Sequence, residues 1–154
     1  MQRIRLRTPF GRDLVVAVEG DVVCASDFRA QAKTALVRPP NGLLREVAAQ
    51  VRAYAERRLR HFDLPLRLDG PPFAVEVWQL VGSLEFGELI SYGEVGRALG
   101  RPLAHRAVAA AMRRTPIDLF IPAHRVVGAD GRLKGGPGAT MRRRLLAHEG
   151  IAIR

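Results

Sequence analysis

The hydrophobic residues change their spacing along this chain, and that change limits the folds open to it. Over residues 3–8 apolar side chains such as Ile4 and Leu6 alternate with arginines, which predicts a β-strand. Two more short strands are expected at 13–18 and 22–26, each after a glycine-containing turn. The first part of the chain therefore predicts an antiparallel meander.

From residue 41 onward the apolar residues recur at helical spacing instead. Asn41, in the break Pro39-Pro40-Asn41-Gly42, is expected to cap a helix that runs to about Arg60. The stripe that would pack on the sheet consists of Leu44, Val47, Ala48, Val51, Tyr54, Ala55 and Leu59. The arginines of this helix mostly lie off the stripe, and a solvated face is the simplest interpretation for them.

The second half predicts short helices. A proline-containing stretch with a short strand at 66–68 leads to a domain boundary near residue 70, and helices are expected at 73–82, 91–100, 102–114 and 139–148. Ser91-Tyr92-Gly93-Glu94 has the spacing of a capping box, and Pro102 would open the following helix. The expected core positions of the helix at 102–114 are Leu103, Ala107, Val108, Ala111 and Met112.

Two short helices joined by a glycine-containing turn are typical of a helix-turn-helix, although the same geometry also occurs as plain helix packing. After them, residues 126–133 carry an Asp-Gly pair, which predicts a hairpin that could form a wing. A helix-turn-helix with a wing would suit binding to duplex DNA.

The charge points to a polyanionic partner. The 154 residues include 25 basic and 15 acidic side chains, and the formal net charge is +10. Only Lys33 and Lys134 are lysines; the other basic residues are arginines, whose planar group of donors suits phosphate. A general bias toward arginine in the genome is the alternative explanation.

Several classes of protein are not supported by the sequence. No apolar run approaches the roughly 20 residues of a membrane span, and residues 1–7 do not resemble a signal peptide, so a cytoplasmic protein is expected. The single cysteine, Cys24, is expected to be a small buried hydrophobe and would react only in a positive, partly exposed environment. One cysteine and four scattered histidines predict no metal site, and no cofactor is expected.

Four segments in order carry a resemblance to a known family. They are residues 86–93 (FGELISYG), 106–113 (RAVAAAMR), 121–127 (IPAHRVV) and 145–150 (LLAHEG). Together they resemble the O6-alkylguanine-DNA alkyltransferases, strongly after residue 73 and weakly before it. The resemblance implies a ribonuclease-H-like α/β domain at 1–70, followed by an α-helical, winged-helix-like domain with a helix-turn-helix at 71–154.

The chain departs from this family at the residue that performs the chemistry. Where the family has Pro-Cys-His-Arg, with the cysteine as nucleophile and alkyl acceptor, this sequence has Pro122-Ala123-His124-Arg125. A methyl side chain has no lone pair, so no catalytic residue is assigned. His124 and Glu149 match the rest of the relay that activates the cysteine, and a hydrogen bond between them is expected to hold the site's shape.

The resemblance also implies how DNA would be bound. Arg106 matches the arginine that fills the gap left by a flipped nucleotide, and Tyr92 matches the tyrosine that contacts the neighbouring phosphate. The expected DNA-binding residues are Tyr92, Arg106, Ala109, Ala110, Met112 and Arg113. The expected lesion pocket is formed by Tyr92, Pro122, Ala123, Val126, Val127, Gly135, Gly136 and Pro137, with backbone carbonyls near 126–127 reading the guanine.

Two further positions differ from the family pattern. Thr115 replaces an asparagine that bridges turns near the active site, and the loop over the guanine, residues 133–138 (LKGGPG), lacks the usual tyrosine. Pro137 stiffens this loop, whereas Gly135 and Gly136 loosen it. Alanine at position 123 would leave a roomier pocket that could admit larger alkyl groups.

Three functions follow as hypotheses. The first is a monomeric, non-enzymatic sensor that binds O6-alkylguanine in duplex DNA by nucleotide flipping and flags it for nucleotide-excision repair proteins. The second is an active O6-methylguanine-DNA methyltransferase whose cysteine has been replaced by Ala123. The third is a helix-turn-helix transcription regulator, which would need asparagine or glutamine among residues 101–114, where neither occurs.

Overall fold

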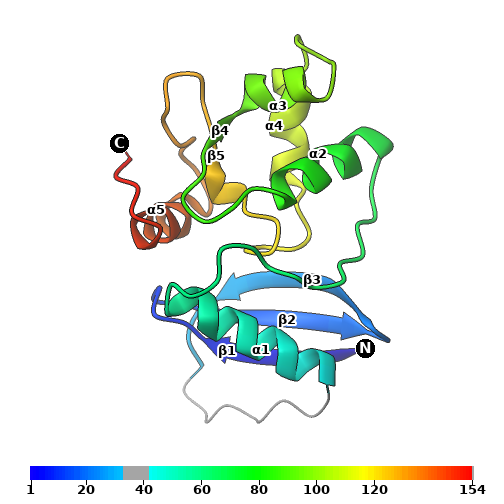
Figure 1. Cartoon of the computed structure of the whole chain (residues 1–154), viewed down its shortest axis with the longest axis vertical. Coiled ribbons are helices and arrows are strands. Elements are labelled where there is room, and N and C mark those ends of the chain that lie inside the picture. Colours follow the sequence, from blue (N-terminus) through cyan, green and yellow to red (C-terminus); the bar gives the residue numbers. More distant parts are fainter. Residues whose placement is uncertain (33–41, 154) are drawn as a thin grey trace. The chain divides into compact units, whose positions relative to one another are not determined.

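A computed structural model describes residues 1–32 and 42–153, and the chain in it divides into two units. Unit 1 contains Met1–Leu68 and Pro116–Asp118; unit 2 contains Asp69–Thr115 and Leu119–Arg154 (Figure 1). The expected cap at Asn41 lies outside the described residues.

The predicted meander is present in unit 1. Strands β1 (Gln2–Arg7), β2 (Asp13–Glu19) and β3 (Val22–Arg29) form an antiparallel sheet in the order β1-β2-β3. The register shifts between Ala17 and Val18, because Ala17 pairs with Ala25 and Val18 pairs with Val23. Cys24 lies at this irregularity and is partly rather than fully buried, contrary to the prediction; its Sγ lies 3.4 Å from the Ala17 carbonyl oxygen.

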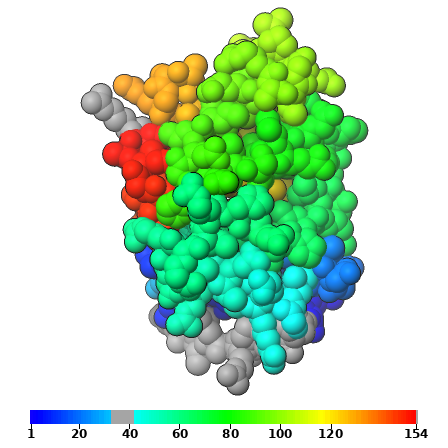
Figure 2. Space-filling model, in the orientation of Figure 1, coloured from blue at the N-terminus to red at the C-terminus, as the bar shows by residue number. Residues whose placement is uncertain are grey.

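Helix α1 (Gly42–Ala55) crosses one face of this sheet (Figure 1), and its atoms cover the strands in the space-filling view (Figure 2). Its buried apolar residues are Leu44, Val47, Val51 and Tyr54, all from the predicted stripe. The helix ends at Ala55 and not near Arg60, because Arg57 adopts a left-handed conformation with φ of 58°. The N–H groups of Arg57 and Arg58 then donate to the carbonyls of Tyr54 and Ala53, which closes the helix.

Two later segments of unit 1 cover the outer edge of β3. Residues 65–67 bridge to Val23, and residues 116–118 bridge to Ser26, both in parallel. The Ser26 hydroxyl also donates to the Asp118 carbonyl at 2.6 Å. These bonds satisfy the edge of the sheet and explain why Pro116–Asp118 belong to unit 1.

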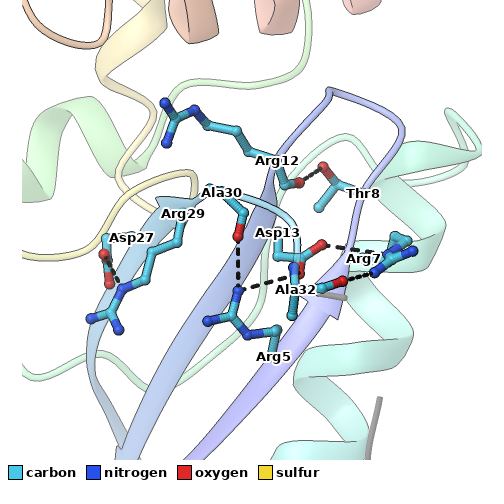
Figure 3. A network of polar contacts seen from close by, with 9 residues as sticks. All are labelled: Arg5, Arg7, Thr8, Arg12, Asp13, Asp27, Arg29, Ala30 and Ala32. Atoms are coloured by element: carbon cyan, nitrogen blue, oxygen red, sulfur yellow. Dashed lines mark hydrogen bonds and ion pairs between the residues drawn. The ribbon is translucent and has the colours of Figure 1, made fainter. Parts of the chain in front are cut away.

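A buried carboxylate fastens the chain after β3 to the other two strands. Asp13 on β2 accepts a hydrogen bond from the Ala32 N–H at 2.9 Å and from Arg5 Nη1 at 3.3 Å (Figure 3). Arg5 and Arg7 donate in addition to the carbonyls of Ala30 and Ala32. Arg5 and Arg7 of β1 thus hold residues 30–32 in place.

Unit 2 is built from helices α2 (Pro72–Gly82), α3 (Tyr92–Ala98), α4 (His105–Arg113) and α5 (Ala139–His148). The buried Trp78 of α2 donates its indole N–H to the Ala111 carbonyl of α4 at 2.9 Å. The predicted capping box at the start of α3 is confirmed, with reciprocal bonds between Ser91 and Glu94.

The start of α4 differs from the prediction. Residues 101–104 form a turn, in which the Ala104 N–H donates to the Arg101 carbonyl, so Pro102 lies before the helix. Leu103 is 91% exposed and Ala107 is exposed, so neither belongs to the core. The predicted core residues Val108, Ala111 and Met112 are buried.

The Asp-Gly signal after residue 126 forms a turn without a hairpin. Gly128 donates to the Arg132 carbonyl at 2.8 Å across Asp130 and Gly131. Strand β5 (Val126–Val127) pairs in parallel with β4 (Ile90–Ser91) and not with residues beyond the turn. Leu133 turns inward instead and packs with Val127 and Leu146.

No helix among residues 1–32 and 42–153 is both long and apolar enough to cross a membrane. The same residues contain no group of three or more histidine, cysteine or acidic side chains arranged to hold a metal ion.

Candidate functional site

Position 123 opens a single turn of 3-10 helix, η1 (Ala123–Arg125). The N–H of Ala123 donates to the Ile121 carbonyl at 2.8 Å, and that of Arg125 to the Pro122 carbonyl at 2.9 Å. This tight turn leaves Ala123 partly exposed while His124 and Arg125 are buried. The turn therefore leaves residue 123 partly exposed immediately before two buried polar side chains.

Glu149, directly after α5, receives hydrogen bonds from three residues of unit 2. His124 Nε2 lies 2.5 Å from its Oε2, and the Gly87 N–H donates to its Oε1 at 2.8 Å. Arg125 binds both oxygens, with Nε 2.9 Å from Oε1 and Nη2 3.1 Å from Oε2. The Glu149 side chain is fully buried, so this carboxylate has exchanged water for four protein donors.

The network fixes the protonation of both titratable partners. Burial opposes ionisation of Glu149, but the bonds from His124, Arg125 and Gly87 outweigh it and hold the pKa of this carboxyl well below its usual range. Burial lowers the pKa of His124, and this effect exceeds the opposing influence of Glu149. His124 is therefore neutral at pH 7; Nε2 carries the proton donated to the carboxylate, and Nδ1 is the basic nitrogen.

Arg125 is the site residue that the sequence did not identify. Besides its two bonds to Glu149, it donates through Nη1 to the Leu84 carbonyl at 2.7 Å. It thereby connects η1, the loop after α2 and the end of α5. The signal was present, because Arg125 belongs to the same short motif as His124, but the sequence analysis assigned it no role.

The β4–β5 pair brings the start of α3 next to this turn. Ser91 pairs with Val127, so Tyr92, the first residue of α3, follows the strand beside the one that leaves η1. The Tyr92 side chain is half-buried, and burial raises the pKa of its hydroxyl against the opposing charges of Arg142 and Arg113. Lys134 Nζ lies 5.3 Å from the centre of the Tyr92 ring.

Helix α4 presents a basic face. Arg106 and Arg113 are exposed, and Ala110 is partly exposed. Ala109 and Met112, which the sequence placed on the DNA-binding surface, are 5% and 8% exposed and face the interior of unit 2. The exposed small residue of this helix is Ala107 instead.

The residues expected to line a lesion pocket fall into two groups. Pro122, Val126 and Val127 are buried, whereas Gly135, Gly136 and Pro137 are exposed. For Val126 and Val127, contact with a base would thus have to come from backbone atoms. Thr115, at the family's asparagine position, donates its hydroxyl to the Met112 carbonyl at 2.9 Å and closes the end of α4.

Comparison with known proteins assigns this arrangement to a family. Residues 72–151 match the family model described as 6-O-methylguanine DNA methyltransferase, DNA binding domain. A methylated-DNA–protein-cysteine methyltransferase of Methanosarcina barkeri is 43% identical over 91 residues, which are 59% of this chain and 58% of that protein. Its counterpart in Methanosarcina acetivorans is 39% identical over 107 residues, 69% of each chain.

A solved structure gives the same result for the fold. The Mycobacterium tuberculosis OGT in complex with DNA is similar with a TM-score of 0.83 and 32% identity, over 97% of this chain and 93% of that one. The chain therefore has the fold of that protein. It spans 58% of the length of the Methanosarcina barkeri relative.

These names contradict one prediction. The chain was expected not to be an enzyme, but its relatives are named as methyltransferases, which are enzymes. The prediction rested on the single side chain of Ala123, whereas the similarity to named enzymes extends over 107 residues.

Proposed function

Because the chain belongs to the family of O6-methylguanine-DNA methyltransferases, we propose that it binds duplex DNA containing an O6-alkylated guanine, with residue 123 beside the alkyl group. The observation that supports this most is the buried hydrogen-bond network of His124, Arg125 and Glu149, two members of which directly follow the partly exposed Ala123. A buried ionised network is costly to form, and two of its members directly follow residue 123 in the same turn, where a methyltransferase would need a base.

Binding would begin on the basic face of α4. Arg106 and Arg113 would engage the backbone of the duplex, and Arg106 would occupy the space left by the rotated nucleotide. Extrusion of a paired base costs a few kcal/mol, which a planar cation stacked in the gap can offset. Tyr92 would contact the adjacent phosphate from the start of α3.

Residue 123 would define the place of alkyl transfer. The relatives' names state that the methyl group moves to a protein cysteine, and His124, whose pKa is lowered by burial, would supply a neutral imidazole as the base. A cysteine at 123 would give its proton to this imidazole, and the thiolate would attack the alkyl carbon. The carbon–oxygen bond breaks as the sulfur–carbon bond forms, and the guanine keeps the electron pair. The imidazolium then returns the proton, through water, to the guanine.

The second sequence hypothesis, a methyltransferase whose acceptor cysteine is replaced by Ala123, agrees best with the relatives. The finer predictions remain proposals: a ribonuclease-H-like unit 1, a winged-helix-like unit 2, a monomer, and transfer of the bound lesion to nucleotide-excision repair proteins.

Binding to matched duplexes with guanine or O6-methylguanine at one position tests the proposal. The salt concentration must be fixed, since phosphate contacts make affinity salt-dependent. We expect a preference for the alkylated duplex. Equal affinity for both duplexes would refute it.

Substitution Ala123→Cys tests the place of transfer. We expect this variant to take the methyl group from the DNA, as detected by mass spectrometry of the protein. Ala129→Cys is the matched control, because Ala129 is exposed in the turn after β5 and should stay unmodified. If the Ala123→Cys variant prefers the alkylated duplex but takes up no methyl group, the site binds the lesion without supporting transfer.

A further inference from the structure

Lys134 occupies an unusual place in this chain. It is one of two lysines among 25 basic residues. Its ammonium group lies 5.3 Å from the centre of the Tyr92 ring, within the range of a cation–π interaction. The side chain itself is exposed.

The backbone on both sides of Lys134 is held in place. Leu133 is buried against Val127 and Leu146. Arg142 of α5 donates to the Lys134 carbonyl at 3.0 Å and to the Pro137 carbonyl at 3.2 Å. Because both bonds go to backbone oxygens, this loop is fixed by its main chain, and the lysine side chain is left to extend from an anchored point.

The charges around Tyr92 are all positive. Arg113 and Arg142 both act on its hydroxyl, and Lys134 lies over its ring. Within the described ranges, no carboxylate forms an ion pair with any of these three cations. Three cations around one half-buried phenol form a place where an anion would be strongly favoured, and a lysine binds phosphate as a compact point charge.

We propose that Lys134 binds the DNA phosphate next to the flipped nucleotide and rests on the Tyr92 ring when DNA is absent. This inference rests on the proposed function, and adds a residue that positions the DNA strand at the lesion. The loop lacks the aromatic side chain that the family resemblance led us to expect, and in its place it supplies a charge.

Salt dependence and chemical neutralisation of single phosphates test the assignment together. Affinity of the alkylated duplex is measured between 50 and 200 mM salt for the wild-type chain, Lys134→Met and Lys134→Arg. Loss of one phosphate contact should reduce the slope of log affinity against log salt by about 0.9. We expect this reduction in Lys134→Met and a wild-type slope in Lys134→Arg.

A scan with methylphosphonate replacing one phosphate at a time then locates the contact. At one position beside the lesion, neutralisation should weaken wild-type binding about tenfold and leave Lys134→Met unaffected. Arg132→Met, an exposed cation two residues earlier, is the control and should retain the wild-type response at that position.

The outcomes separate this inference from the proposed function. An unchanged salt slope in Lys134→Met, with or without weaker binding, would overturn the phosphate contact and leave a packing role for the loop. If the wild-type chain shows no preference for the alkylated duplex, the proposed function fails first. If neutralising the same phosphate in plain duplex then weakens binding of the wild-type chain but not of Lys134→Met, Lys134 makes a general DNA contact. That result would overturn the proposal that Lys134 binds beside a flipped nucleotide.

Discussion

Each unit of this protein contains a buried carboxylate that pairs with arginine, and the two carboxylates are satisfied very differently. Glu149 in unit 2 has both oxygens bonded, by His124, Arg125 and the Gly87 N–H. Asp13 in unit 1 is equally inaccessible, yet its Oδ1 accepts no hydrogen bond and lies 3.6 Å from Arg7 Nε. One network is complete and the other is not.

The exposure of the arginines explains the contrast. The side chain of Arg125 is 4% exposed, whereas those of Arg5 and Arg7 are 33% and 49% exposed. The guanidinium groups of Arg5 and Arg7 can therefore bind water in place of Asp13. The buried guanidinium of Arg125 has no such alternative to Glu149. The complete network holds together η1, the loop after α2 and the residue after α5, whereas the looser one fastens a chain segment to a sheet (Figure 3).

Glu149→Gln should have the largest effect. It keeps the shape of the side chain but leaves the buried guanidinium of Arg125 without a counter-charge, which costs about 3–5 kcal/mol of unfolding free energy. Urea unfolding followed by the fluorescence of Trp78, the only tryptophan and a buried residue of unit 2, measures it. Glu76→Gln on the exposed side of α2 is the control. A loss below about 1 kcal/mol would mean that water reaches Arg125.

Asp13→Asn should cost less, about 1–3 kcal/mol. The amide oxygen can still accept the Ala32 N–H, and the arginines can turn to water. Hydrogen exchange of the β2 amides reports on unit 1 directly, and Asp27→Asn, in a half-exposed pair with Arg29, serves as control. A loss of unfolding free energy as large as that of Glu149→Gln would show that water does not replace the carboxylate as the partner of Arg5 and Arg7.

Much of the fold could be predicted from the sequence, because it follows local patterns. The alternation of β1, the stripe of α1 and the capping box at Ser91 each depend on residues within one element. The end of α1 could not be predicted, since Arg57 adopts a left-handed conformation that usually belongs to glycine. The start of α4 could not be predicted either, because residues 101–104 form a separate turn before the helix. Leu119, buried with φ of 72°, is a similar case.

The candidate site could also be predicted only in part. His124 and Glu149 could be paired from the resemblance, and their side chains do meet. Arg125 and the Gly87 N–H could not, because their bonds to Glu149 span 24 and 62 residues and no periodicity connects such positions. The burial of Ala109 was also missed, since it depends on how α4 rotates against its neighbours. Met112 was expected both in the core and on the DNA-binding surface, and it is buried.

Acid should weaken the complete network in two steps. The pKa of His124 is lowered from 6.5, so the unfolded chain takes up a proton first, and stability falls as the pH drops below about 6.5. The lowered pKa of Glu149 adds a second loss below about 4.5. Each proton contributes at most about 1.4 kcal/mol per pH unit.

Unfolding midpoints from pH 7.5 to pH 4, followed by Trp78 fluorescence, measure this dependence. His124→Gln should remove the first step and retain the second. If stability instead rises as the pH falls from 7 to 5, His124 is charged in the folded state, and the imidazole is not the base that the proposed function requires.

Arg7→Gln should produce the smallest change, about 0.5 kcal/mol, because a half-exposed arginine gains little from its pair. The substitution removes the ion pair with Asp13 and the bond to the Ala32 carbonyl, but water replaces both. Arg3→Gln, at an exposed position of the same strand, controls for the loss of charge. A double-mutant cycle with Asp13→Asn gives the coupling itself, which should stay below about 1 kcal/mol. A larger coupling would mean that the Nε–Oδ1 separation of 3.6 Å closes in solution and that Asp13 is satisfied as fully as Glu149.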